Sequence, residues 1–293
     1  MELKNGPPPK NQPLRRLVVA ALQQRMHHIA ALQLGEAGHD DELIHEIRVA
    51  TKEFRAYLGL LREPAARRLR IREKARLQTA ARSLAPNRDP LVIRETLERL
   101  ARRCDRITGR DSLHRLLLHL GEGPAQNASP NKIINTAGRE LAASAAAIST
   151  RFQRRLTDDA LLDAFRREYR RAWRVTASAR RKPDVDSWHE WRKRVKALHY
   201  QANCLAAIRP GKLKRLAREM WRLQALLGRH HDLHITRARV KRMRLDRVNE
   251  PCRRRTIHLL NLEISRTERK AKLLTKAWLK QRPREFAEKL KPA

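Results

Sequence analysis

The sequence has few of the residues that several large protein classes require. Its 293 residues include 10 Gly, 14 Pro and 3 Cys, and only 4% of the chain is aromatic. A collagen-like or low-complexity chain would be rich in Gly or Pro, so both classes are excluded, and an α/β enzyme built on Gly-rich turns is disfavoured. The cysteines Cys104, Cys204 and Cys252 form no CxxC or CxxH pattern, which argues against a zinc site or a disulfide framework.

Acidic residues are also scarce relative to basic ones. The chain has 31 Asp+Glu against 67 Lys+Arg, which gives a formal net charge of +36. Self-repulsion at this charge is severe unless a polyanion is the normal partner. No stretch is apolar enough to span a bilayer or to act as a secretory signal, so we expect a cytoplasmic protein with no membrane contact.

Apolar residues recur three and four apart nearly everywhere after residue 13, and Ala, Leu, Arg and Lys dominate, which predicts an all-α chain. Residues 1–13 carry four prolines and are expected to form a disordered arm, and the Gly, Pro, Asn and Ser cluster at 121–131 is the best internal boundary. The predicted helices are 14–34, 40–62, 64–85, 90–104, 110–120, 131–156, 159–181, 187–208, 211–228, 232–247 and 252–281. Gly228 is expected to end the ninth of them.

An internal repeat is the most informative feature. Residues 45–55 read HEIRVATKEFR and residues 189–199 read HEWRKRVKALH, so His, Glu, Arg and Lys coincide at an offset of 144. Further along, Arg88-Asp89 matches His231-Asp232 at an offset of 143. The chain is therefore predicted to contain two related helical bundles, repeat one at about 14–120 and repeat two at about 131–285.

Each copy of the motif sorts its charges when it is placed on a helix. The cations fall on one narrow stripe, and the apolar residues form the adjoining face. The stripe residues are His45, Arg48, Lys52 and Arg55 in the first copy and His189, Arg192, Lys193, Lys196 and His199 in the second. Glu46 and Glu53 are expected to point away from both faces. A solvated helix usually mixes signs as i,i+4 pairs, so this sorting favours an anion site over a merely basic surface.

The helix starts support the same interpretation. Ser187 and Glu190 have the spacing of a capping box, and Asp40 or Asp41 is expected to start the other motif helix. Each motif His would then lie near a helix N-terminus, where free N–H groups and the helix dipole also favour anions.

Three other groups have less specific interpretations. Asp89 and Asp232 each precede a predicted helix and are expected to be N-caps or partners for Arg rather than catalytic acids. The cluster His230, His231, Asp232 and His234 could suggest a metal, but no second ligand set lies at a known spacing, so neither metal nor cofactor is expected. Trp188 and Trp191 lie on the apolar face and are expected in the core.

The repeated motif resembles that of the CHAD family, the conserved-histidine α-helical domain. The likeness lies in the H-x-x-R-x-x-x-K pattern at 45–52 and 189–196, and it extends to RVKALHY at 194–200 and to LG-x-x-x-D at 227–232, with a counterpart at 84–89. It covers about residues 14–285. The sequence departs from the family's more usual Arg-Tyr at His199-Tyr200.

The resemblance implies two four-helix bundles related by pseudo-two-fold symmetry. It also implies association with polyphosphate granules and a basic central surface that binds inorganic polyphosphate. The family's basic positions fall on the stripe residues other than Lys193, which is an additional cation on the same stripe. Some relatives carry a triphosphatase module, whereas this chain begins directly with the helical domain, so no catalytic activity is inherited.

Two other functional classes remain open. Non-specific binding to nucleic acid, RNA above all, is expected at this charge, although the stripes lack the aromatic residues of single-strand binders. An enzyme of phosphoryl transfer would need carboxylate-held metals or a phosphate-binding Gly loop, and the sequence has no GxxxxGK[ST] motif. The sequence does not indicate the oligomeric state or the preferred polyphosphate length.

Overall fold

The structure is a computed structural model of the chain, and it describes residues 13–34, 40–84, 89–104, 107–120, 130–154, 156–243 and 249–290. These residues are helical with short connections and contain no strand, which confirms the predicted all-α class. The predicted N-terminal arm, apart from Pro13, and nearly all of the predicted boundary at 121–131 lie outside the described residues.

Eleven α-helices and one short 3-10 helix are present in the described part of the chain. In chain order they are α1 (Leu14–Leu34), α2 (Asp40–Leu58), η1 (Pro64–Ala66), α3 (Arg67–Ser83), α4 (Asp89–Arg102), α5 (Ile107–His119), α6 (Pro130–Gln153), α7 (Asp158–Arg181), α8 (Val185–Cys204), α9 (Pro210–Arg242), α10 (Glu250–Lys280) and α11 (Pro283–Glu288).

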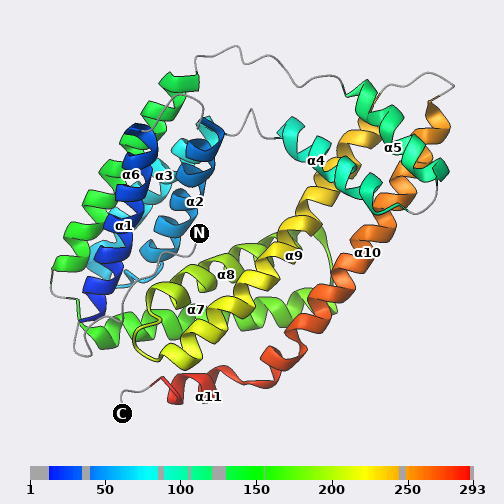
Figure 1. The fold of residues 1–293 in the computed structure, drawn as a ribbon. Coiled ribbons are helices and arrows are strands. Elements are labelled where there is room, and N and C mark those ends of the chain that lie inside the picture. Colours follow the sequence, from blue (N-terminus) through cyan, green and yellow to red (C-terminus); the bar gives the residue numbers. More distant parts are fainter. Residues whose placement is uncertain are drawn as a thin grey trace. The chain divides into compact units, whose positions relative to one another are not determined.

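The chain divides into two compact units. Unit 1 consists of residues 1–84, 128–222 and 277–293, and unit 2 consists of residues 85–127 and 223–276. Both units therefore combine segments from the first and the second half of the sequence, and the long helices α9 and α10 contribute to both (Figure 1).

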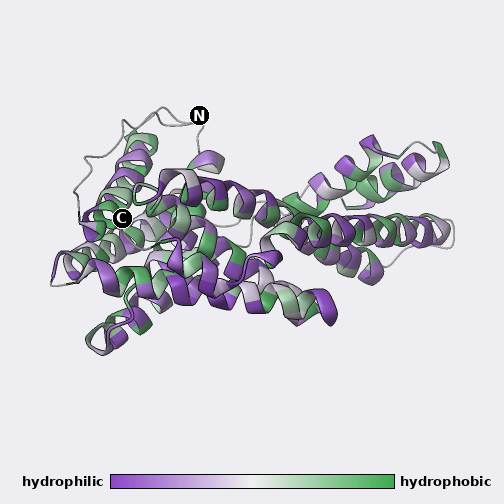
Figure 2. Ribbon diagram, turned by 90° about the horizontal axis from the view of Figure 1, so that it is seen from below, coloured by the Kyte–Doolittle hydropathy of each residue, from purple (hydrophilic) through white to green (hydrophobic). Residues whose placement is uncertain are grey.

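Within unit 1, α6 packs against α1, α2 and α3, and α8 packs against both α7 and α2. The short α11 closes on α7, where the Phe286 ring stacks on Tyr169 with a centroid separation of 3.8 Å and an interplanar angle of 5°. The centre of the unit is filled by apolar side chains such as Phe54, Phe152 and Trp191, all of which are inaccessible to solvent. Polar and apolar residues alternate around the helices, as Figure 2 shows, which is the pattern of helices with one buried face.

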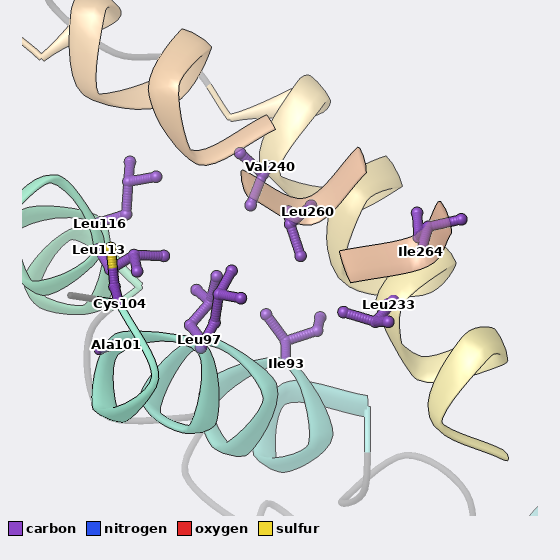
Figure 3. Packing of buried hydrophobic residues seen from close by; sticks show 11 residues of the cluster. Ile93, Leu97, Ala101, Cys104, Leu113, Leu116, Leu233, Val240, Leu260 and Ile264 are labelled. Atoms are coloured by element: carbon purple, nitrogen blue, oxygen red, sulfur yellow. The ribbon is translucent and has the colours of Figure 1, made fainter. Parts of the chain in front are cut away.

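Unit 2 has its own hydrophobic core. Leu97 of α4 and Leu113 of α5 are fully buried, and they cluster with Leu233 and Val240 of α9 and Leu260 of α10. Figure 3 shows Ile93 and Leu97 projecting from α4 toward the part of the cluster that α9 and α10 supply.

Several predicted helix ends are wrong, and the clearest case is Gly228. Gly228 does not end a helix, because α9 continues through it from Pro210 to Arg242 and joins the two predicted segments 211–228 and 232–247. One helical glycine costs only about 1 kcal/mol relative to alanine, and burial of Leu223, Leu227 and Leu233 on the same helix outweighs that cost. The helices α2 and α8 each end four residues before the predicted end, at Leu58 and Cys204, and a turn follows each of them.

The helix bounds repeat along the chain. Moved by 144 positions, the starts of α1, α2 and α3 fall on residues 158, 184 and 211, and the helices α7, α8 and α9 begin at Asp158, Val185 and Pro210. In the second half α9 is continuous where the first half has two helices, α3 and α4. The pseudo-two-fold relation and the pair of four-helix bundles stay predictions.

Candidate functional site

The two cationic stripes lie on two helices of one compact unit that pack against each other. The first stripe belongs to α2 and the second to α8, and both helices are part of unit 1. At their C-terminal ends the helices are joined by a buried hydrogen bond, in which Gln201 Nε2 donates to the Ala56 carbonyl at 2.7 Å. Arg55 and His199, the last members of the two stripes, each lie within two residues of this bond in the sequence.

Burial of the adjoining apolar face holds each motif helix in position. Ile47 and Phe54 of α2 are fully buried, and so are Trp191, Val195 and Leu198 of α8. Trp188 is 4% exposed, and its ring lies 4.9 Å from that of Trp191, so both tryptophans are core residues as predicted. Because the apolar side is fixed inward, the stripe beside it is fixed at the edge of the core.

The stripe residues are arranged between core and solvent. His45, His189 and Lys193 are exposed, whereas the remaining stripe residues are half-buried: Arg48, Lys52, Arg55, Arg192, Lys196 and His199. The Arg48 guanidinium donates a hydrogen bond to the Leu84 carbonyl at 2.9 Å, so it also closes the end of α3. Burial lowers the pKa of Arg55, and the described residues provide it with no hydrogen bond or ion pair.

The glutamates of the first motif do not point away from the core, which corrects the prediction from the sequence. Glu53 is 7% exposed and accepts hydrogen bonds from the Tyr57 hydroxyl at 2.7 Å and from Arg25 Nε at 2.8 Å. Arg25 also binds Glu46 at 2.6 Å. An arginine of α1, which the motif does not contain, thus neutralises both glutamates and holds them beside α1.

In the second motif, too, arginines outside the stripe engage the glutamate. Glu190 accepts from Arg194 Nε at 2.6 Å, and Arg171 of α7 lies 3.6 Å away. Desolvation would raise the pKa of Glu190, but the hydrogen bond and charge of Arg194 outweigh it and lower that pKa. Lys193 lies 3.9 Å from Glu190, so one stripe cation also contacts this carboxylate.

The start of α8 differs from the expected one. The helix begins at Val185, and its N-cap is Asp184, whose carboxylate accepts from the Ser187 N–H at 2.7 Å while the Ser187 hydroxyl accepts from the Asp184 N–H at 3.1 Å. The predicted Ser187–Glu190 capping box is therefore wrong, because Asp184 takes the cap and Glu190 binds Arg194 instead. His189 still lies in the second turn, close to the helix N-terminus.

The two histidines of the α8 stripe have different surroundings. His189 is exposed, but partial desolvation of its ring and the positive charges of Lys193 and Arg192 together lower its pKa. His199 is half-buried, and its Nδ1–H donates to the Ala217 carbonyl of α9 at 2.9 Å. Burial lowers the pKa of His199 as well, so near pH 7 its ring is mainly neutral and Nε2 is left as an acceptor.

The predictions for the two aspartates have different outcomes. The side chain of Asp89 lies outside the described residues, although α4 begins at that position. Asp232 lies inside α9, so it is not an N-cap. Its neighbours His230 and His234 gather with Glu268 of α10 into a group that could hold a metal ion, and this group belongs to unit 2, not to the unit of the stripes.

A comparison with known protein families covers both motif helices. The family model described as the CHAD domain matches residues 20–241, a span that contains α2 and α8 in full. No curated protein matches the chain. Within the described residues, no helix combines the length and the apolar character that crossing a membrane demands. Because this match covers more than half of the chain, the chain belongs to the CHAD-domain family.

Proposed function

We propose that this protein binds inorganic polyphosphate, without catalysis, through the two cationic stripes of α2 and α8. The observation that carries the proposal is the packing of α2 on α8 within one unit, which brings residues 144 positions apart onto neighbouring helices. Membership of the CHAD family supports the choice of polyphosphate among the polyanions.

The side chains of the stripes suit a chain of phosphates. Arginine offers two parallel N–H donors to phosphate oxygens, and lysine supplies a mobile point charge. The carboxylates Glu46 and Glu190 within the motifs are engaged mainly by arginines outside the stripes, Arg25 for Glu46 and Arg194 for Glu190. Polyphosphate has no bases, and the nearby Trp188 and Trp191 are buried and offer no stacking surface.

The same carboxylates support a non-catalytic role. Phosphoryl transfer relies on carboxylate-held metal ions beside the reacting phosphate. On the motif helices, Glu46, Glu53 and Glu190 bind arginine or tyrosine rather than forming an acidic cluster. We therefore expect binding, and with it recruitment to polyphosphate granules in the cytoplasm, but no release of orthophosphate.

A charge-matched pair of variants tests the site. Replacing Arg192, Lys193 and Lys196 by Ala should weaken binding of polyphosphate by at least about tenfold, since each lost charged hydrogen bond is worth about 1.5–3 kcal/mol. The control replaces Arg269, Lys270 and Lys276, three exposed cations of α10, and also removes three charges. Binding is measured by titration with labelled polyphosphate, and helicity by circular dichroism.

The results separate the alternatives. An equal loss in both variants would mean that general charge, and not the stripe, holds the ligand. Loss of helicity in the stripe variant alone would assign these side chains to the fold. Competition at physiological salt by single-stranded RNA of equal charge decides the remaining question, because ready displacement of polyphosphate would favour a non-specific nucleic-acid binder.

A further inference from the structure

We propose that unit 2 contains a binding site for one divalent transition-metal ion of the Zn²⁺ type, formed by His230 and His234 of α9 together with Glu268 of α10. The three residues each offer a ligand atom, and these atoms all lie within 4.8 Å of one another. The three residues belong to unit 2, whereas the cationic stripes belong to unit 1. The proposal therefore does not depend on polyphosphate binding.

The first element of the site is local. His230 and His234 are four residues apart, so they lie on one face of the continuous helix α9, and their ring centroids are 4.4 Å apart. Two histidines at this spacing on a helix are a common way to hold zinc. If α9 ended at Gly228 and restarted at residue 232, as expected from the sequence, the two rings would not share one regular helix.

The third ligand comes from another helix. Glu268 Oε1 lies 3.1 Å from His230 Nε2, and both helices belong to unit 2 at these positions. Ligands about 2.0–2.1 Å from a tetrahedral Zn²⁺ are roughly 3.3 Å apart, so this pair already has the separation that coordination requires. A His₂Glu set leaves the fourth position for water.

The burial and the hydrogen bonds of the cluster point to a ligand. His230 is only 5% exposed, and His234 Nε2 is buried with no hydrogen-bond partner among the described residues. A buried ring nitrogen without a partner costs free energy, and a metal ion would offset that cost. Glu268 supplies a carboxylate oxygen to the group, so the ligand set combines two imidazoles with one carboxylate.

The side chain of Arg237 disfavours a metal ion at this site. Arg237 Nη2 lies 3.2 Å from His234 Nδ1, and in this arrangement Nδ1 accepts and the ring proton sits on Nε2. Coordination through Nε2 moves the proton to Nδ1, so Arg237 must turn away. Its Nη1 already donates to Asn261 Oδ1 at 2.9 Å, which offers the guanidinium an alternative position.

Metal binding to the tag-free, metal-stripped full chain tests the site. Zn²⁺ titration by calorimetry should show one tight site, and Co²⁺ should give the visible absorption of a tetrahedral complex. Each of the variants His234→Gln and Glu268→Gln should weaken Zn²⁺ binding at least about tenfold. Arg237→Gln should strengthen it, because it removes a competing donor and a positive charge.

The control is His258→Gln, which removes an exposed histidine of α10 and should leave the tight site unchanged. An equal loss in His258→Gln, or unchanged affinity in His234→Gln and Glu268→Gln, would overturn the proposal. So would the absence of a tight Zn²⁺ site in the parent chain. Circular dichroism of each metal-free variant shows that it is folded, and Arg237→Gln tests the site by a gain that misfolding cannot produce.

Discussion

At the scale of single residues, positions that match in the repeat need not have the same chemistry. Arg55 and His199 correspond at the offset of 144. Arg55 carries a charge at any physiological pH, whereas His199 gives Nδ1–H to Ala217 and has a pKa lowered by burial. The α2 stripe therefore ends in a permanent cation, and the α8 stripe ends in a group that becomes a cation only in acid.

Two glycines of the chain differ in the space around them. Gly59 follows α2, and a Cβ there would lie 2.9 Å from the Ala56 carbonyl oxygen and 2.9 Å from Gln201 Nε2. These two atoms form the hydrogen bond that joins α2 to α8. Gly228 lies inside α9, and a Cβ there would meet no atom within 4 Å.

We predict opposite effects for the two alanine substitutions. Gly59→Ala should destabilise the protein by about 1–3 kcal/mol, because the new methyl group displaces a buried contact between the motif helices. Gly228→Ala should stabilise it by about 0.5–1 kcal/mol, because alanine loses less entropy in a helix. Denaturant unfolding of the two variants measures both changes, and destabilisation by Gly228→Ala would contradict the continuity of α9.

At the scale of helices, the spacing of apolar residues predicted nearly every helix, but it did not predict all of the helix ends. The predicted 14–34 agrees with α1 in full, and the starts of α6 and α7 differ from the prediction by one residue. A predicted end was wrong where a different cap residue, or the packing of a buried face, outweighed the local sequence pattern. Gly228 looked like a stop because the sequence does not show the packing that carries α9 past it.

The N-cap of α8 gives a prediction at this scale. Asp184→Ala should cost about 1 kcal/mol of stability, because it leaves the Ser187 N–H without its carboxylate acceptor. The matched control is Asp186→Ala, which removes an exposed acid from the same turn and should lose only the helix-dipole contribution, about 0.3 kcal/mol. Thermal unfolding compares the two variants, and equal losses would mean that the cap contributes nothing beyond charge.

At the scale of the whole molecule, the charge of +36 attracts any polyanion, and the stripes are expected to supply the direct contacts. These two contributions differ in their response to salt. Each phosphate that a cation contacts releases counterions, so the logarithm of affinity falls with the logarithm of salt concentration in proportion to the number of contacts.

We predict that the Arg192, Lys193 and Lys196 triple variant reduces this slope by about two to three for polyphosphate. The Arg269, Lys270 and Lys276 variant should change the affinity slightly and the slope by less than about one. Titrations at several NaCl concentrations measure both slopes. Identical slopes in the two variants would contradict direct contact by the stripe.

The all-helical class, the motif helices and the positions of their cations follow from the order of residues, because helical periodicity and a repeat are local properties. The family likeness follows for the same reason. The neutralisation of Glu46 and Glu53 does not, since Arg25 reaches them from another helix. Nor does the group of His230, His234 and Glu268, because its acid is separated from His230 by 38 positions and meets it through helix packing alone. Contacts between distant segments depend on how apolar faces pack together, and that packing has no signal in any short stretch of the chain.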